Sequence, residues 1–294
     1  MKFVLFGFFL LTTTAWSEGE GRWPYDLQHP KRTYMLPDEL LEVSGLTDVD
    51  ANTVACLQDE DAKLYFYDLR EGRIVRTLTF GAPGDYEGLT RVGMEYFALR
   101  SDGLIHRMLL QDDHVHVVDT FRLDVPNKNI EGLGYDEMTG RVLVTPKDFI
   151  KGSKETRDLR VVYALDPTTC LLDPSPALTL SVMDIAEQAR ARGFKAAMRT
   201  TNSGRTVPAL KLRLASIAVH PITGQYHLLS ASDRTLLVLD RKGALVEIRR
   251  LDVGLFPKPE GITFMPNGDM LISNEGKDAR PNLHYFVMRQ KGRS

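Results

Sequence analysis

Short apolar runs recur along the chain at a nearly constant spacing. Each run begins at a small motif whose second residue is serine or glutamate, and glycine follows in four of the five copies. The copies are Val43-Ser44-Gly45-Leu46, Tyr86-Glu87-Gly88-Leu89, Ile130-Glu131-Gly132-Leu133, Ala215-Ser216-Ile217-Ala218 and Pro259-Glu260-Gly261-Ile262. Their second residues lie 43, 44, 85 and 44 positions apart. Because internal repetition fixes the architecture of a chain, this repeat is the best guide to the fold.

Each copy of the repeat predicts four strands. A turn and a second apolar run follow each motif, as in Pro266-Asn267-Gly268 before Met270 to Ile272, and such pairs indicate hairpins. Four antiparallel strands in roughly 40 to 45 residues make up one propeller blade. The sequence therefore predicts an all-β, five-bladed β-propeller with four-stranded antiparallel blades over residues 32–290.

Two irregularities interrupt the repeat. The last unit lacks a fourth strand, and Arg32 to Leu36 can supply it, which would close the ring and leave no free sheet edge. The double gap contains residues 181–213, where no strand alternation is visible and Val182 to Met198 has a helical pattern. We expect a helical insertion between blades 3 and 4 rather than a decayed sixth blade.

The N-terminal residues predict export. Lys2 precedes the apolar run Phe3 to Leu11, and Ala15-Trp16-Ser17 resembles a cleavage site, so residues 1–17 are expected to be a signal peptide. The alternative, a membrane anchor, is disfavoured because the run is shorter than the ~20 residues that span a bilayer. The mature chain is then periplasmic or secreted with no transmembrane span, and residues 18–31 form a linker. Its two cysteines, Cys56 and Cys170, are expected to stay unpaired.

Overall charge excludes one class of partner. The net charge is −2, whereas binding a nucleic-acid backbone requires an excess of clustered Lys and Arg. The 43% of hydrophobic residues suffices for a sizeable core. We expect a monomer with no nucleic-acid partner.

The candidate chemistry lies on the propeller axis. The first strand of every blade lines the central channel, so the repeated positions Ser44, Glu87, Glu131, Ser216 and Glu260 should form a ring. Carboxylates about 5 Å apart repel by ~3 kcal/mol per pair at an effective dielectric of ~20, so a positive partner is needed. Oxygen ligands without His or Cys favour calcium, with Glu87, Glu131 and Glu260 as the predicted metal ligands.

Charge compensation without a metal is equally open at this point. Lys147 and Arg100, near the ends of second strands, could form salt bridges with the ring, or one carboxyl could stay protonated. Other polar residues should face the channel mouth. The predicted channel-lining or ligand-contact residues are Ser44, Lys147, Arg100, Ser216, Ser230 and Asn274.

Two further features have competing interpretations. The insertion carries seven Lys and Arg residues against two acids, so it could form a basic lid that accepts a small anionic ligand, or a solvated helix on the propeller side. His114 and His116 alternate on one strand and are better explained by a solvent-facing outer strand than by a metal site.

Taken together, the repeated segments resemble the SdiA-regulated family of exported bacterial propellers, distant relatives of the NHL-repeat propellers. The likeness is carried by the five motifs, by Lys147, and by the stretch from Pro259 to Gly276. It implies a five-bladed propeller with a calcium site, but no established activity. Two functions remain open: a binding module that presents one face to a protein or glycan, and a metal-dependent hydrolase, lactonase- or phytase-like, at the central channel.

Overall fold

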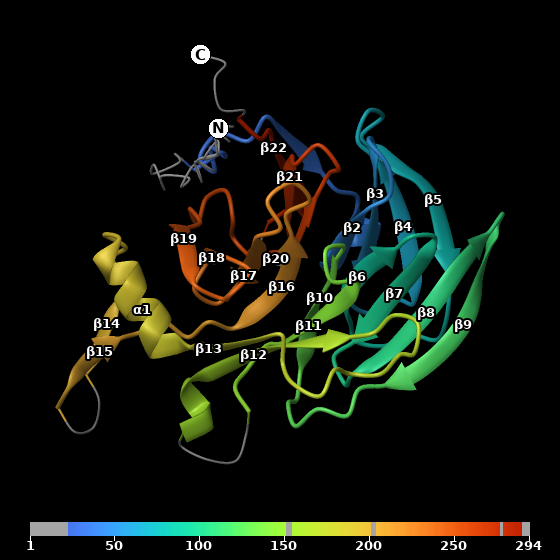
Figure 1. Cartoon of the computed structure of the whole chain (residues 1–294). Coiled ribbons are helices and arrows are strands. Elements are labelled where there is room, and N and C mark those ends of the chain that lie inside the picture. The colour runs from blue at the N-terminus through green and yellow to red at the C-terminus, as the bar shows by residue number, and fades with distance from the viewer. Residues whose placement is uncertain (1–22, 151–154, 201–203, 277–278, 290–294) are drawn as a thin grey trace, which may run out of the picture.

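The computed structural model describes residues 23–150, 155–200, 204–276 and 279–289. These residues form five four-stranded antiparallel sheets arranged as the blades of a propeller (Figure 1). The predicted fold is confirmed. Residues 1–17, predicted to be a signal peptide, lie outside the described residues. No helix among the described residues is long and apolar enough to cross a membrane.

The blades follow the order of the sequence. Blade 1 contains β2 (Val43–Asp48), β3 (Thr53–Gln58), β4 (Lys63–Asp68) and β5 (Arg73–Thr79). Blade 2 contains β6 (Tyr86–Val92), β7 (Glu95–Arg100), β8 (Leu104–Gln111) and β9 (His114–Arg122). Blade 3 contains β10 (Ile130–Asp136), β11 (Arg141–Pro146), β12 (Leu159–Leu165) and β13 (Leu178–Ser181). Blade 4 contains β16 (Leu214–Val219), β17 (Tyr226–Ser230), β18 (Thr235–Leu239) and β19 (Leu245–Arg250). Short 3-10 helices, η1 (Asp38–Leu40) and η2 (Glu155–Asp158), precede β2 and β12.

Blade 5 closes the ring with both ends of the chain. It contains β20 (Pro259–Phe264), β21 (Met270–Asn274), β22 (Asn282–Phe286) and, as its outermost strand, β1 (Arg32–Met35). Tyr34 pairs with Leu283 in this ladder, and its ring packs edge-on against Tyr67 of blade 1. The predicted closure is therefore confirmed, and β1 joins the first blade to the last.

The insertion packs on the side of the propeller. Helix α1 (Val182–Ala191) starts after Ser181, whose hydroxyl accepts a hydrogen bond from the Asp184 amide at 3.0 Å. The helix ends seven residues before Met198, and a hairpin of β14 (Met198–Thr200) and β15 (Thr206–Pro208) follows, so the prediction of a longer helix without strands was wrong. Short helices end where the buried face runs out, and no buried residue of this helix lies beyond Ala189.

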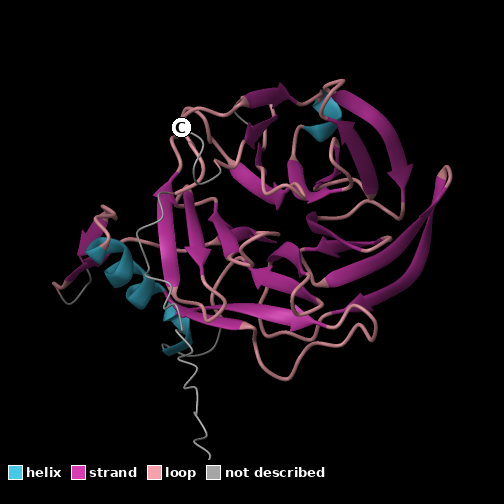
Figure 2. Ribbon diagram, turned by 45° about the horizontal axis from the view of Figure 1, so that its top comes forward, coloured by secondary structure: helices cyan, strands magenta, loops and turns pink. Residues whose placement is uncertain are grey.

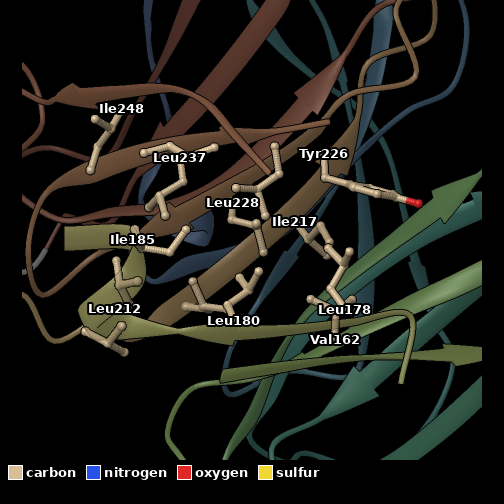
Figure 3. Packing of buried hydrophobic residues seen from close by; sticks show 14 of the residues in the cluster. Val162, Leu178, Leu180, Ile185, Leu212, Ile217, Tyr226, Leu228, Leu237 and Ile248 are labelled. Atoms are coloured by element: carbon tan, nitrogen blue, oxygen red, sulfur yellow. The ribbon is translucent and has the colours of Figure 1, made fainter. Parts of the chain in front are cut away.

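The apolar face of α1 fills the space between blades 3 and 4. Ile185 joins a buried cluster that includes Leu180 of β13 and Ile248 of β19 (Figure 3). Figure 2 places the helix and the hairpin outside the ring of strands. The structure therefore matches the helix on the propeller side and not a lid over the channel.

Residues 23–31, part of the stretch expected to be a linker, pack against the propeller. Tyr25 is buried in the cluster shared by blades 4 and 5, where its hydroxyl donates to the Gly268 carbonyl at 2.6 Å. His220 accepts hydrogen bonds at Nδ1 from the amides of Ile222 and Thr223, so its Nε2 carries the proton and donates to the Tyr25 hydroxyl at 2.8 Å. Both cysteines are free, as predicted: Cys56 is buried and Cys170 is half-buried.

Every inner strand begins with the same irregularity. The pairing between the first and second strands shifts by one residue at the start of β2, β6, β10, β16 and β20, which is a β-bulge. In blades 2, 3 and 5 the residues passed over by the ladder are Glu87, Glu131 and Glu260. The bulge therefore turns the repeated acidic position out of the regular ladder.

The same register corrects the predicted alignment of blade 4. There the ladder runs from Leu214 directly to Ser216, so Ala215 occupies the position of the glutamates. Ser216 stands where the other four blades have glycine. The prediction that Ser216 belongs to the ring was wrong, because matching serine to serine in sequence moved the blade-4 motif by one residue.

The glycine position is the most crowded part of the axis. A Cβ on Gly88 would lie 2.8 Å from the Glu131 carbonyl oxygen, and a Cβ on Gly261 would lie 2.8 Å from the Ser44 carbonyl oxygen. Each inner strand thus approaches the backbone of the next blade too closely for a side chain. Blade 4 is the exception, where the Ser216 hydroxyl accepts a hydrogen bond from the Ile262 amide at 3.3 Å.

Because of this crowding, substitution by alanine should destabilise the protein to different extents at equivalent positions of different blades. Gly88→Ala should lower the free energy of unfolding by about 1–3 kcal/mol, since the added methyl group overpacks against blade 3. Ser216→Ala should cost about 1 kcal/mol or less, because blade 4 already accommodates a Cβ and loses one weak hydrogen bond. Urea unfolding of both variants measures the difference; equal costs would contradict the crowding argument.

Candidate functional site

Three glutamates from three blades converge at one mouth of the channel. Glu131 is 3% exposed, and Glu87 and Glu260 are half-buried. The negative charge of Glu131 raises the pKa of both other glutamates, after the larger effect of burial. The predicted acidic ring is present, with Ser44 and Ala215 completing it. We call the three glutamates and the charged residues around them the glutamate mouth.

Lys147 is the main positive partner of these glutamates. Its ammonium group forms an ion pair with Oε1 of Glu131, and its charge also acts on Glu87 and Glu260. The turn after β11 holds it there, because the Lys147 amide donates to the Asn129 carbonyl at 2.9 Å. The predicted lysine salt bridge is thus found, whereas Arg100 pairs with Asp102 at 2.6 Å instead of with the ring.

The sequence reasoning missed a second lysine. Lys258 lies two residues before Glu260, with its Nζ 3.7 Å from Glu260 Oε1, and forms an ion pair with Glu275. The Glu275 amide donates to the Lys258 carbonyl at 3.0 Å, which ties the end of β21 to the entry of β20. The signal available in sequence was the Lys-Pro-Glu order immediately before an inner strand.

Among the residues that the structure describes, acidic groups still outnumber the two lysines. The carboxyl of Asp59 lies beside Glu42 and Glu275, and burial together with these neighbours raises its pKa to about 7. Asp85 raises the pKa values of both Glu87 and Glu131, and Asp148 raises that of Glu131. Asp148 itself pairs with Arg213 at 3.0 Å. The glutamate mouth therefore has an excess of carboxyl groups.

Burial and mutual repulsion keep several of these carboxyls protonated to unusually high pH. The pKa of Glu87 is raised to about 9, first by burial and then by Glu131 and Asp85. The pKa values of Glu131 and Glu260 are raised to about 7, again chiefly by burial, although Lys147 acts in the opposite direction on both. Glu87 is therefore neutral at pH 7, and part of the predicted compensation is a proton.

Other predicted contact residues have structural partners. The Ser44 hydroxyl donates to the Tyr86 carbonyl at 2.7 Å, and the Ser230 hydroxyl donates to Asp233 at 3.0 Å. The Asn274 amide donates to the Leu255 carbonyl and to Asn282, while its buried Oδ1 accepts no hydrogen bond. Ser44 thus links the inner strands β2 and β6, and Ser230 holds the turn after β17.

Metal binding stays a prediction. Among the described residues, no group of three or more His, Cys, Asp or Glu side chains has an arrangement that could hold a metal ion. The Lys147 ammonium already contacts the glutamate that calcium would need. His114 and His116 are exposed on β9, the outermost strand of blade 2, as the sequence indicated.

The fold and the acidic mouth define a five-bladed β-propeller with a buried carboxyl cluster on its axis. In structure the chain is similar to the glutaminyl cyclase of Myxococcus xanthus, with a TM-score of 0.58 and 14% identity over 89% of this chain and 96% of that one. It is also similar to a luciferin-regenerating enzyme, with a TM-score of 0.50 and 8% identity over 90% of this chain and 96% of that one. The sequence matches no protein-family model and no curated protein. These likenesses show the fold alone.

The buried carboxyls predict that stability falls as pH rises. The folded protein holds the Glu87 proton up to about pH 9, whereas an ordinary glutamate releases it near 4.5. The stabilisation is complete below the ordinary pKa and is lost as pH rises through the folded pKa. Glu87→Gln should therefore gain on the order of a few kcal/mol relative to wild type between roughly pH 5 and pH 9.

Urea unfolding at several pH values measures this effect. Glu137→Gln is the matched control, since Glu137 is exposed on the turn between β10 and β11. For the control, the free energy of unfolding should depend on pH as it does for wild type. For Glu87→Gln, it should change less with pH. Parallel curves for all three proteins would show that Glu87 titrates normally.

Proposed function

We propose that this chain is an exported ligand-binding propeller and that its glutamate mouth binds a positively charged ligand. The resemblance of the five motifs to the SdiA-regulated exported propellers supports export and a cation at the axis. The interpretation favours a binding module over an enzyme because the mouth has an excess of buried carboxyls and no nucleophile paired with a base.

One observation carries the proposal. Oε2 of Glu131 is buried and accepts no hydrogen bond from any described residue, although Oε1 of the same carboxyl is held by Lys147. An unpaired buried carboxylate oxygen is costly, because it has lost its water without gaining a donor. A cation or ammonium group bound beside Glu131 would satisfy this oxygen.

Two kinds of cation share the required chemistry. Calcium is supported by the carboxylate oxygens of the mouth, which are the ligands it prefers, and by its abundance outside the cytoplasm. An organic amine is supported by the two lysine ammonium groups that already contact the carboxyls, which indicates that the mouth accommodates N–H donors. Either ligand would lower the pKa values of Glu131 and Glu260 as it binds.

Calorimetric titration tests the proposal. Chelator-treated protein should bind either calcium chloride or spermidine, and affinity should rise from pH 6 to pH 8 as Glu131 and Glu260, with pKa values of about 7, become ionised. Glu131→Gln should weaken binding by about tenfold or more, because it removes a buried charged acceptor.

The control variant is Glu137→Gln, which lies on the turn between β10 and β11 and should bind like wild type. Calcium uptake alone would identify a metal site, and spermidine uptake alone an amine site. No heat with either probe at pH 8, or equal binding by Glu131→Gln, would reject the proposal.

A hydrolase is the second candidate, favoured by one feature. Glu87 has a pKa of about 9 and Glu131 one of about 7, so the mouth holds a protonated carboxyl beside one that ionises near neutrality. Pairs of carboxyls separated in this way can serve as general acid and general base. Turnover of a lactone or phosphate-ester panel that Glu87→Gln abolishes would support an enzyme; wild-type rates in Glu87→Gln would exclude this role for Glu87.

A further inference from the structure

The channel has a cavity at the end opposite the glutamates. It has a volume of about 630 Å³, within the roughly 300–1,000 Å³ typical of small-molecule sites. The residues two places after the ring position form its floor. They are Leu46, Leu89, Leu133, Ile217 and Ile262, and all five are buried. We call these five residues the aliphatic layer, and each also packs in the hydrophobic cluster between two neighbouring blades.

Three threonines line the cavity at the same repeat position. Thr47, Thr90 and Thr263 follow the aliphatic layer by one residue on β2, β6 and β20, and each is at most 6% exposed. The equivalent residues of the other two blades are Gly134 and Ala218, which leave space on that side of the channel. None of the three hydroxyls forms a hydrogen bond with a described residue, so all remain available to a ligand.

The charged groups around this cavity are already paired, except Glu137, which is exposed at its edge. Arg91 donates from Nε to the Asp48 carbonyl at 3.0 Å and from Nη1 to the Gly93 carbonyl at 2.8 Å, and its Nη2 lies 3.5 Å from the Asp48 carboxylate. Asp136, fully buried, pairs with Arg241 at 2.6 Å. Burial lowers the pKa of His220, and both of its ring nitrogens are engaged. The walls thus offer hydroxyls and apolar surface, with no uncompensated buried charge.

The rim of the cavity combines apolar side chains with the charged residues Arg91 and Glu137. Three consecutive inner hairpins carry large exposed hydrophobic residues at their turns: Met94 is 79% exposed, Met138 is 71% exposed and Ile222 is 61% exposed. Met138 and the neighbours of the other two line the cavity itself. Such residues grouped around one opening are more informative than scattered ones, because they favour the entry of an apolar molecule.

We propose that this cavity, which we call the threonine pocket, binds an uncharged, largely apolar small molecule that carries hydroxyl or carbonyl oxygens. The aliphatic floor takes the apolar body, and the hydroxyls of Thr47, Thr90 and Thr263 hydrogen-bond to its oxygens. Binding in this pocket should be independent of the cation proposed for the glutamate mouth.

Nile red, a neutral carbonyl-bearing dye whose emission shifts in apolar surroundings, is the probe. Wild type should bind it with a blue-shifted, saturable signal. Thr90→Val and Thr263→Val together should weaken binding by about tenfold or more, because valine keeps the shape of threonine and removes two hydrogen-bonding groups. Melting temperatures within a few degrees of wild type would show that the double variant folds.

Two control variants separate the alternatives. Glu131→Gln should leave Nile red binding unchanged, and the double threonine variant should leave cation binding at the glutamate mouth unchanged. Met94→Ser with Met138→Ser tests adsorption to the rim. Loss of binding in this rim variant alongside full binding by the threonine variant would overturn the proposal, as would the absence of saturable binding by wild type.

Discussion

The five inner strands meet so closely that most blades have no room for a side chain beside the axis. A Cβ on Gly45 would lie 2.6 Å from the backbone of Leu89, and one on Gly132 would lie 3.1 Å from Ser216. Glycine relieves this contact, and the β-bulge immediately before it turns the preceding residue out of the ladder. The bulge recurs in all five blades and the glycine in four, and together they set the packing of the blades and the position of the glutamates.

The two ends of the channel follow from this arrangement because strand residues alternate and advance by about 3.3 Å each. The bulged residue lies at one mouth, the aliphatic layer comes two residues later, and the threonine position follows it. Acidic side chains thus gather at one end, while hydroxyls and apolar side chains gather at the other. Along the inner strands the aliphatic layer comes between the two groups, and the pKa of Glu87, raised to about 9, is set by burial and by its acidic neighbours at its own end.

Much of this architecture could be predicted from the sequence. The spacing of the motifs gave the number of blades, and the missing fourth strand of the last unit indicated closure by β1. The register of blade 4 could not be predicted from the sequence. Ser216 aligns with Ser44, the ring residue of blade 1. The residue that occupies the ring position in blade 4 is Ala215, and no other blade has alanine there. The hairpin β14–β15 was missed because strands of three residues carry too little alternation to detect.

The acidic residues of the site could be predicted from the sequence, whereas its lysines could be predicted only in part. Glu87, Glu131 and Glu260 repeat with the blades, so periodicity finds them, whereas Lys258 occurs in one blade only and has no repeat to mark it. Lys147 contacts Glu131 and its charge also acts on Glu87 and Glu260, while blade 4 contributes the uncharged Ala215. A ring of five equal ligands would favour a centred metal ion. Three acids beside an uncharged gap instead favour a cation held off the axis, by Glu131 and its unpaired oxygen.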